Sequence, residues 1–150
     1  YLNTGLGMDY KTEKLSIMLA PVSGKFTFVL DDKLSEDGAF GVDPGKKTRG
    51  EFGATVKMEY KTPLVKNVDM ETKLDLFSNY LEKPQNIDVD WKILINMKIN
   101  DWLSANLSTR LIYDDDVLID IDDNGDGEVD RQGRRVQFME MFGAGLSIKF

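Results

Sequence analysis

The chain has 150 residues, of which 41% are apolar and 30% charged, and its 26 acidic and 19 basic residues give a net charge of −7. This length predicts a single domain covering residues 1–150, and the negative charge argues against nucleic acid as a partner. Cysteine and histidine are both absent. Disulfides, thiolate metal sites and the usual general base near neutral pH are therefore excluded, and we do not expect an enzyme.

Alternating apolar and polar residues, the pattern of a β-strand with two different faces, recur along the whole chain. The sequence predicts strands over residues 2–10, 14–20, 51–61, 68–80, 87–99, 103–113 and 136–150. Residues 24–31 alternate more briefly and predict either an eighth strand or, as we favour, part of a folded-in outer loop. Glu140 interrupts the last strand, which suggests a bulge or a kink that turns its carboxylate inward.

The longest alternating run, residues 87–99, indicates a strand of unusual length. Its odd positions are all apolar, and its even positions are polar except for Leu94. Strands average about 5 to 6 residues, whereas a strand that crosses a bilayer needs about 9 to 11. No apolar run is long enough for a transmembrane helix, and only helices and closed barrels satisfy their backbone groups in lipid. The run therefore predicts a strand of a transmembrane β-barrel.

The connections and the aromatic residues indicate the same architecture. Short connections at 11–13, 63–66 and 100–101 alternate with longer ones at 21–48, 82–86 and 115–134, as periplasmic turns alternate with outer loops in outer-membrane barrels. Aromatic residues fall near both ends of the strands, as in the two interfacial girdles of such barrels. Those at the long-loop ends are Phe52, Tyr80, Trp91, Tyr113 and Phe138, and those at the short-turn ends are Tyr10, Tyr60, Trp102 and Phe150.

We therefore predict an all-β fold, a transmembrane antiparallel up-and-down β-barrel in the bacterial outer membrane. Seven or eight of its strands fall within residues 1–150. Barrels of this class have an even number of strands and a periplasmic N-terminus, so we expect at least one N-terminal strand to be missing from this segment. The full barrel would then hold at least eight strands, and a size of about 10 to 12 fits the class.

Several segments of the chain resemble a known family. They are residues 21–29, 38–42, 76–80, 86–91, 112–116 and 136–150. Together they resemble an uncharacterised family of Bacteroidetes outer-membrane β-barrel proteins, classed as a domain of unknown function. The resemblance implies a fold and a localisation but no activity. The C-terminal Phe150 also resembles the terminal signal read by the barrel-assembly machinery, which implies that machinery as a partner during insertion.

The sharpest candidate site is an acidic loop near the C-terminus. In the frame that begins at Asp122, oxygen-bearing residues occupy positions 1, 3, 5 and 9, and Gly127 occupies position 6. This spacing matches the first half of a calcium loop, although position 12 is Gly133 and not glutamate. One interpretation is Ca²⁺ in the 120–131 loop, and the other is a solvated acidic loop rich in turn-forming residues. The candidate metal ligands are Asp122, Asn124, Asp126, Glu128 and Asp130.

Charged residues of both signs lie on the polar faces of the predicted strands. They are Lys57, Glu59, Glu71, Lys73, Asp75, Asp88, Asp90, Lys92, Lys98 and Arg110. Such a lining predicts either a channel with a selectivity field or, as the mixed signs favour, a lumen filled and closed by ion pairs. Residues 114–116, three consecutive aspartates, extend the acidic rim, and we expect them to be solvated.

We predict a structural or interaction role in the outer membrane, with no catalytic residue and no certain cofactor. The first alternative is a small passive channel. The second is a soluble ligand-binding β-barrel, which requires the apolar face to point inward. The expected partners are the lipid bilayer with its lipopolysaccharide and a protein partner in an outer-membrane complex.

Overall fold

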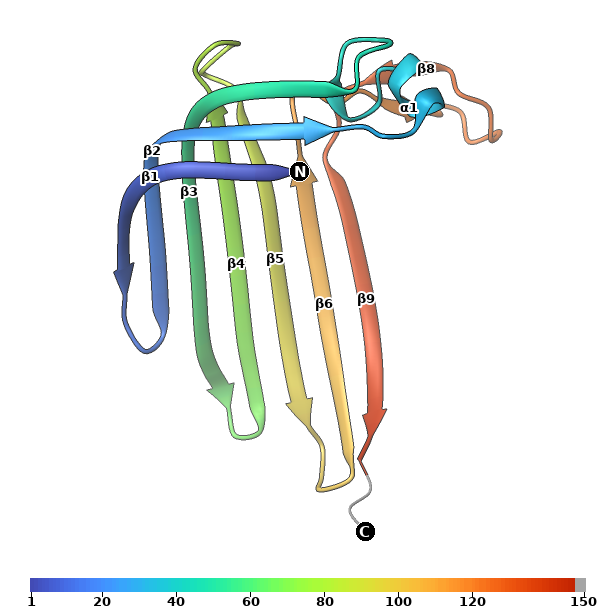
Figure 1. The fold of residues 1–150 in the computed structure, drawn as a ribbon. Coiled ribbons are helices and arrows are strands. Elements are labelled where there is room, and N and C mark those ends of the chain that lie inside the picture. The colour runs from blue at the N-terminus through green and yellow to red at the C-terminus, as the bar shows by residue number, and fades with distance from the viewer. Residues whose placement is uncertain (148–150) are drawn as a thin grey trace.

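The computed structural model describes residues 1–147 and has an all-β fold (Figure 1). Its elements are β1 (Leu2–Lys11), β2 (Leu15–Phe28), α1 (Asp32–Glu36), η1 (Ala39–Gly41), β3 (Thr48–Val65), β4 (Val68–Asn79), β5 (Ile87–Lys98), β6 (Leu103–Tyr113), β7 (Ile119–Ile121), β8 (Arg131–Gly133) and β9 (Gln137–Leu146). Strands β1 to β6 and β9 form one antiparallel sheet in that order, while β7 and β8 form a separate hairpin. The predicted up-and-down order of antiparallel strands is confirmed.

The alternation in the sequence gives this sheet two different faces. Strands β4, β5, β6 and β9 pair without a register shift, so residues of one parity stay on one face from strand to strand. Leu74 lies opposite Trp91, for example, and Trp91 lies opposite Leu111. We call the face that carries these residues the apolar face. The opposite face, here the inner face, carries the charged residues.

Strands β1, β2 and β3 bend sharply, so that their upper parts in Figure 1 fold over the inner face. The pairing of β2 with β3 shifts register between Ala20 and Ser23, and such a bulge bends and twists a strand. Gly53 allows two backbones to approach closely near this bend. A Cβ atom on Gly53 would lie only 1.9 Å from the carbonyl oxygen of Ser78.

The sheet has two free edges, formed by β1 and β9. Within residues 1–147, β1 pairs with β2 alone and β9 with β6 alone, so one edge of each strand has no partner. Six successive antiparallel pairings make β1 and β9 run in the same direction. The chain described by the structure is thus an all-β, antiparallel sheet that is not closed into a barrel.

The segment 24–31 differs from the interpretation we favoured. Its first part, Gly24–Phe28, is neither a loop nor a separate strand but continues β2 and pairs with the start of β3. The bulge explains the difference, because it moves the apolar residues from odd positions up to Leu19 to even positions from Val22. A search for unbroken alternation therefore ends the strand too early.

The two long loops contain short elements of their own. Residues 29–47 hold α1 and η1, and the side chain of Asp31 caps α1 by accepting the backbone N–H of Leu34. The loop after β6 holds the β7–β8 hairpin. No helix within the described part of the chain is long and apolar enough to cross a membrane.

Glu140 lies on the apolar face, and the expectation of a bulge or an inward kink was wrong. Strands β6 and β9 pair without a shift, which places Glu140 opposite Thr109, between Phe138 and Phe142 along β9. The last residues of the predicted strand, including Phe150, lie outside the described residues.

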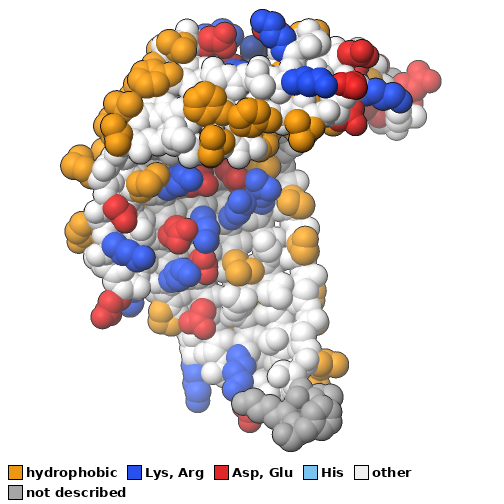
Figure 2. Space-filling view, viewed as in Figure 1, with side chains coloured by type: hydrophobic (Ala, Val, Ile, Leu, Met, Phe, Trp, Pro, Cys, Tyr) orange, Lys and Arg blue, Asp and Glu red, His pale blue; other side chains and the backbone are white. Residues whose placement is uncertain are grey.

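Few side chains of this sheet are fully buried. Within residues 1–147 the buried apolar side chains are Ala20 and Ala105 in the sheet, Val29 and Val42 in the loop after β2, and Ile121 in β7. Large residues of the apolar face stay exposed, among them Phe142 at 69% and Leu146 at 71%. Figure 2 shows acidic and basic side chains gathered on the inner face, beneath the folded-over strands. This polarity is the reverse of that in a soluble β-sandwich, whose inner faces form an apolar core.

Candidate functional site

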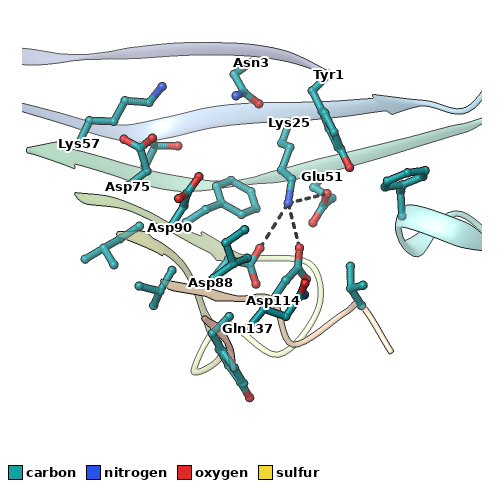
Figure 3. Close-up of a pocket in the computed structure, with 18 of the residues that line it drawn as sticks. Tyr1, Asn3, Lys25, Glu51, Lys57, Asp75, Asp88, Asp90, Asp114 and Gln137 are labelled. Carbon is teal, nitrogen blue, oxygen red and sulfur yellow. Dashed lines mark hydrogen bonds and ion pairs between the residues drawn. The ribbon is translucent and has the colours of Figure 1, made fainter. Parts of the chain in front are cut away.

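A cavity of about 570 Å³ lies where the folded-over parts of β1–β3 face the inner side of β4–β6 (Figure 3). Its walls come from β1 to β6, from the start of β9, from η1 and from the loop that follows β6, including β7. The lining combines charged side chains with four aromatic residues, Tyr1, Phe40, Phe77 and Tyr113. The alternation of the strands directs Phe77 and most of the charged side chains to this space. Tyr1 and Phe40 reach it from outside the strands, and Tyr113 ends β6 with the parity of the apolar face.

Lys25 is the centre of the charged cluster in this cavity. Its Nζ lies 3.6 Å from a carboxylate oxygen of Glu51, 3.4 Å from Asp88 and 3.7 Å from Asp114, as Figure 3 shows. The same ammonium group lies 5.4 Å from the centre of the Phe77 ring, within the range of a cation–π contact. One cation therefore joins the folded-over strand β2 to β3, to β5 and to the loop after β6.

Arg49 forms a second junction beside the first. It contacts Glu51 at 3.3 Å and Asp116 at 2.6 Å, and it donates a hydrogen bond to the carbonyl oxygen of Gly41. The carboxylate of Glu51 is almost fully buried, and a buried carboxylate is tolerated when it is paired. Lys25 and Arg49 together supply that pairing, and they fix the two long loops against the sheet.

Further along the inner face, ion pairs of alternating sign continue. Arg110 binds Asp90 through two hydrogen bonds of 2.9 and 2.7 Å, the strong bidentate arrangement. Lys73 contacts both Glu59 at 3.2 Å and Glu71 at 3.3 Å. The Arg110–Asp90 and Lys73–Glu59 contacts cross between neighbouring strands and tie the inner face together, whereas Lys73 and Glu71 both lie on β4.

Most of the predicted inward charges are therefore brought together by the structure. Lys92 adds a contact to Asp90, and Lys98 contacts Asp101 in the turn after β5. Lys57 and Asp75 are direct cross-strand neighbours, yet neither forms an ion pair within residues 1–147. Sequence reasoning missed the central residues Lys25 and Arg49, because β2 and β3 were predicted to be shorter than they are.

The three aspartates after β6 are not a solvated rim. Asp114 contacts Lys25, and Asp116 contacts Arg49. Asp115 is 8% exposed and accepts hydrogen bonds from Tyr113 and Asn86. We expected exposed charges there, but folded-over strands supply cations that the local sequence does not reveal.

The predicted metal ligands lie together in the exposed loop between β7 and β8. The carboxylate of Asp122 accepts the backbone N–H groups of Asn124, Gly125 and Gly127. Asn124 accepts from the backbone of Asp126, whose carboxylate accepts from the backbone of Glu128. Asp130 accepts from the backbone of Asp123 at the loop's base. These bonds explain the Asp, Asn and Gly residues as a chain of turns.

No group of three acidic side chains in the described residues is gathered closely enough to hold a metal ion. Calcium in this loop therefore stays a prediction. The backbone N–H of Gly127, and to a smaller extent that of Gly125, lowers the pKa of Asp122 below its usual range. Hydrogen bonds to a carboxylate favour its charged form. The loop thus depends on an ionised Asp122.

Comparison with known proteins gives a family without an assigned activity. The sequence model of the family described as "Protein of unknown function, DUF481" matches residues 1–124. The chain belongs to this family. The match covers β1 to β7 and every residue of the Lys25 and Arg49 junctions. Neither the curated proteins nor the solved structures contain a match.

Proposed function

We propose that this DUF481 chain forms part of the wall of a bacterial outer-membrane β-barrel, with a structural or interaction role and no catalytic activity. The observation that carries the proposal is the polarity of the sheet. Large residues of its apolar face stay exposed within residues 1–147, and its inner face holds a charged network (Figure 2). A sheet of this kind suits lipid on one side and a polar lumen on the other.

The exposed apolar area is too large to be incidental. Phe138, Phe142 and Leu146 on β9 are each more than 60% exposed, and β1 adds Leu6 and Met8 on the same face. Soluble monomers rarely expose contiguous apolar patches larger than a few hundred Å². Contact with lipid tails removes such a surface from water, so the lipid bilayer is the partner that we propose for this face.

Strand length and aromatic placement support the same proposal. Strands β4 and β5 have 12 residues each, and about 9 to 11 tilted residues span a bilayer. Phe52 and Tyr80 pack edge to face at 5.9 Å near the long loops, while Trp102 lies in the short turn before β6. Aromatic residues at both ends of the strands match the two interfacial girdles of outer-membrane barrels.

Closure of the barrel needs strands beyond the seven described here. Because β1 and β9 run in the same direction, one added strand, or any odd number, could pair antiparallel with both free edges. We propose that such strands complete the barrel, with insertion by the barrel-assembly machinery and lipopolysaccharide around the outer rim. A protein partner at the free edges is the interaction role that we propose.

The ion pairs favour a closed lumen over a channel. Lys25 and Arg49 connect folded-over strands to the opposite wall near the long loops, where a channel would need an opening. A passive channel remains the second candidate because a cavity of about 570 Å³ lies beside these contacts. A soluble ligand-binding barrel is the third candidate, and it needs the opposite curvature, with the apolar face inside.

The proposal is tested with the purified protein in detergent. A barrel resists unfolding in detergent at room temperature, so the unheated sample should migrate differently from the boiled sample on a gel. Reconstituted into a planar bilayer, the protein should conduct no measurable ionic current. Regular conductance steps would instead support the passive channel, and solubility without detergent together with unchanged migration would contradict membrane insertion.

A further inference from the structure

The cavity beneath the folded-over strands has charges that nearly cancel. Five carboxylates and four cations line it: Glu51, Asp75, Asp88, Asp90 and Asp114, with Lys25, Arg49, Lys57 and Arg110. Seven of these nine groups already form ion pairs, and the remaining two, Lys57 and Asp75, carry opposite charges on neighbouring strands. No single sign of charge dominates, so the cavity has little reason to select an anion or a cation.

The hydrogen-bonding capacity of the cavity is far from saturated. Five lining side chains make no hydrogen bond or ion pair within residues 1–147, namely Tyr1, Asn3, Lys57, Asp75 and Gln137. A carboxylate offers about four acceptor positions and an ammonium group three donors, so the paired groups also keep free positions. Donors and acceptors therefore stand side by side on the same wall.

Aromatic rings complete the lining. The Phe77 ring lies on the inner face of β4, two residues from Asp75. Tyr1 and Phe40 pack edge to face at 6.3 Å, and Figure 3 shows Tyr1 beside Lys25 at the border of the cavity. Aromatic rings thus stand beside the many hydrogen-bonding groups of the lining, and convergent polar groups next to aromatic rings recur in small-molecule sites.

We propose that this cavity binds a neutral saccharide of about two or three rings, a size that suits the usual range of ligand pockets. Each sugar hydroxyl both donates and accepts hydrogen bonds, which matches a wall of mixed donors and acceptors without net charge. The apolar C–H face of a sugar ring can lie against Phe77. The inference goes beyond the proposed wall role and does not depend on membrane insertion, because the cavity is formed within the described chain.

Binding is tested by calorimetric titration of the folded full chain in detergent. The probes are maltotriose and triacetylchitotriose, with spermine and citrate as cationic and anionic controls. At least one saccharide should bind saturably and more tightly than both charged controls. Asp75→Asn should weaken its binding about tenfold, since a charged hydrogen-bond partner is lost. Phe77→Leu should weaken it about fivefold, since the ring face is lost.

Matched controls separate the cavity from the rest of the molecule. Asp69→Asn makes the same change on the inner face near the short turns, and Phe142→Leu makes the same change on the apolar face. Both should bind the saccharide as the unchanged protein does. Gln137→Ala provides a third cavity variant if Asp75→Asn or Phe77→Leu fails to fold.

The inference is overturned if neither saccharide saturates, if spermine or citrate binds more tightly, or if the cavity variants bind like their controls. A protein that conducts no current and migrates differently before and after boiling, yet binds no saccharide, would contradict this inference alone. The proposed role in a barrel wall would be unaffected.

Discussion

At the scale of single residues, Glu140 is the most unusual side chain of the sheet. Among the described strands it is the only acidic or basic residue that the register places on the apolar face. It lies in the same cross-strand row as Thr109, Ile93 and Thr72, and Ile93 is the middle of the alternating run of β5. A carboxylate at that level would face lipid tails in the proposed barrel.

Replacing Glu140 by leucine should therefore stabilise the protein in lipid vesicles. We expect the free energy of unfolding in urea to rise by about 1 kcal/mol, because an acidic group on the lipid face costs less than the 2–4 kcal/mol of a basic one. Glu59→Leu, which removes a partner of Lys73 on the inner face, should lower it. Equal effects of the two substitutions would contradict the assignment of the faces.

Lys25 provides a second residue-scale prediction. Lys25→Met leaves three carboxylates facing one another without their shared cation. We expect a loss of about 1–3 kcal/mol in the free energy of unfolding, less than for a fully buried pair because the side chains are partly exposed. Lys46→Met removes a highly exposed pair with Asp43 and should change stability by less than about 0.5 kcal/mol. Similar losses for both variants would show that the cluster is not a junction.

At the scale of elements, alternation predicted some features of the fold well and others poorly. Strand β5 (Ile87–Lys98) and its neighbours pair without shifts, so their period of two was visible in the sequence. The bulge of β2 hides the continuation of the strand, because it changes the parity of the apolar residues. The Lys25 junction depends on that continuation and on contacts more than 60 residues apart, which no local pattern reveals.

The bend of β1–β3 depends on Gly53 at a close backbone approach. Gly53→Ala should lower the free energy of unfolding by about 1–3 kcal/mol, because the new Cβ atom would collide with the Ser78 carbonyl. Gly50→Ala, in the same strand, meets only the Phe26 ring at 3.5 Å and should be neutral or slightly stabilising. Urea unfolding of both variants tests this, and an unaffected Gly53→Ala protein would contradict the described bend.

The loop between β7 and β8 should be sensitive to acid. Because the pKa of Asp122 is lowered in the folded loop, its contribution is present at neutral pH and is lost as the pH falls through that lowered value. Proteolysis within residues 122–130 should therefore accelerate well below the usual titration range of aspartate, and Asp122→Asn should accelerate it already at pH 7. Glu128→Gln should not, since the Glu128 carboxylate caps no backbone group in the described chain. If added Ca²⁺ protects the native loop but not Asp122→Asn, the calcium interpretation gains support.

At the scale of the whole molecule, the sheet is a wall with reversed polarity. Alternating side chains give each strand one apolar and one charged face. Pairing without register shifts extends those faces across β4, β5, β6 and β9. The bends of β1–β3 then direct the charged face around a cavity (Figure 3). Ion pairs hold this inner side together, while the apolar side is left for a lipid environment, which we propose to be the outer membrane.

The most direct test of this account is a cysteine scan along β5, since the chain has no cysteine of its own. Spin labels at positions 88 to 97 are examined in lipid vesicles for collisions with oxygen, which concentrates in lipid, and with a water-soluble nickel chelate. Collisions with oxygen should peak at the odd positions, such as 93 and 95, and fall at the even ones, such as 92 and 96. Uniform accessibility to the nickel chelate, or oxygen maxima at the even positions, would contradict the proposal that the apolar face meets lipid.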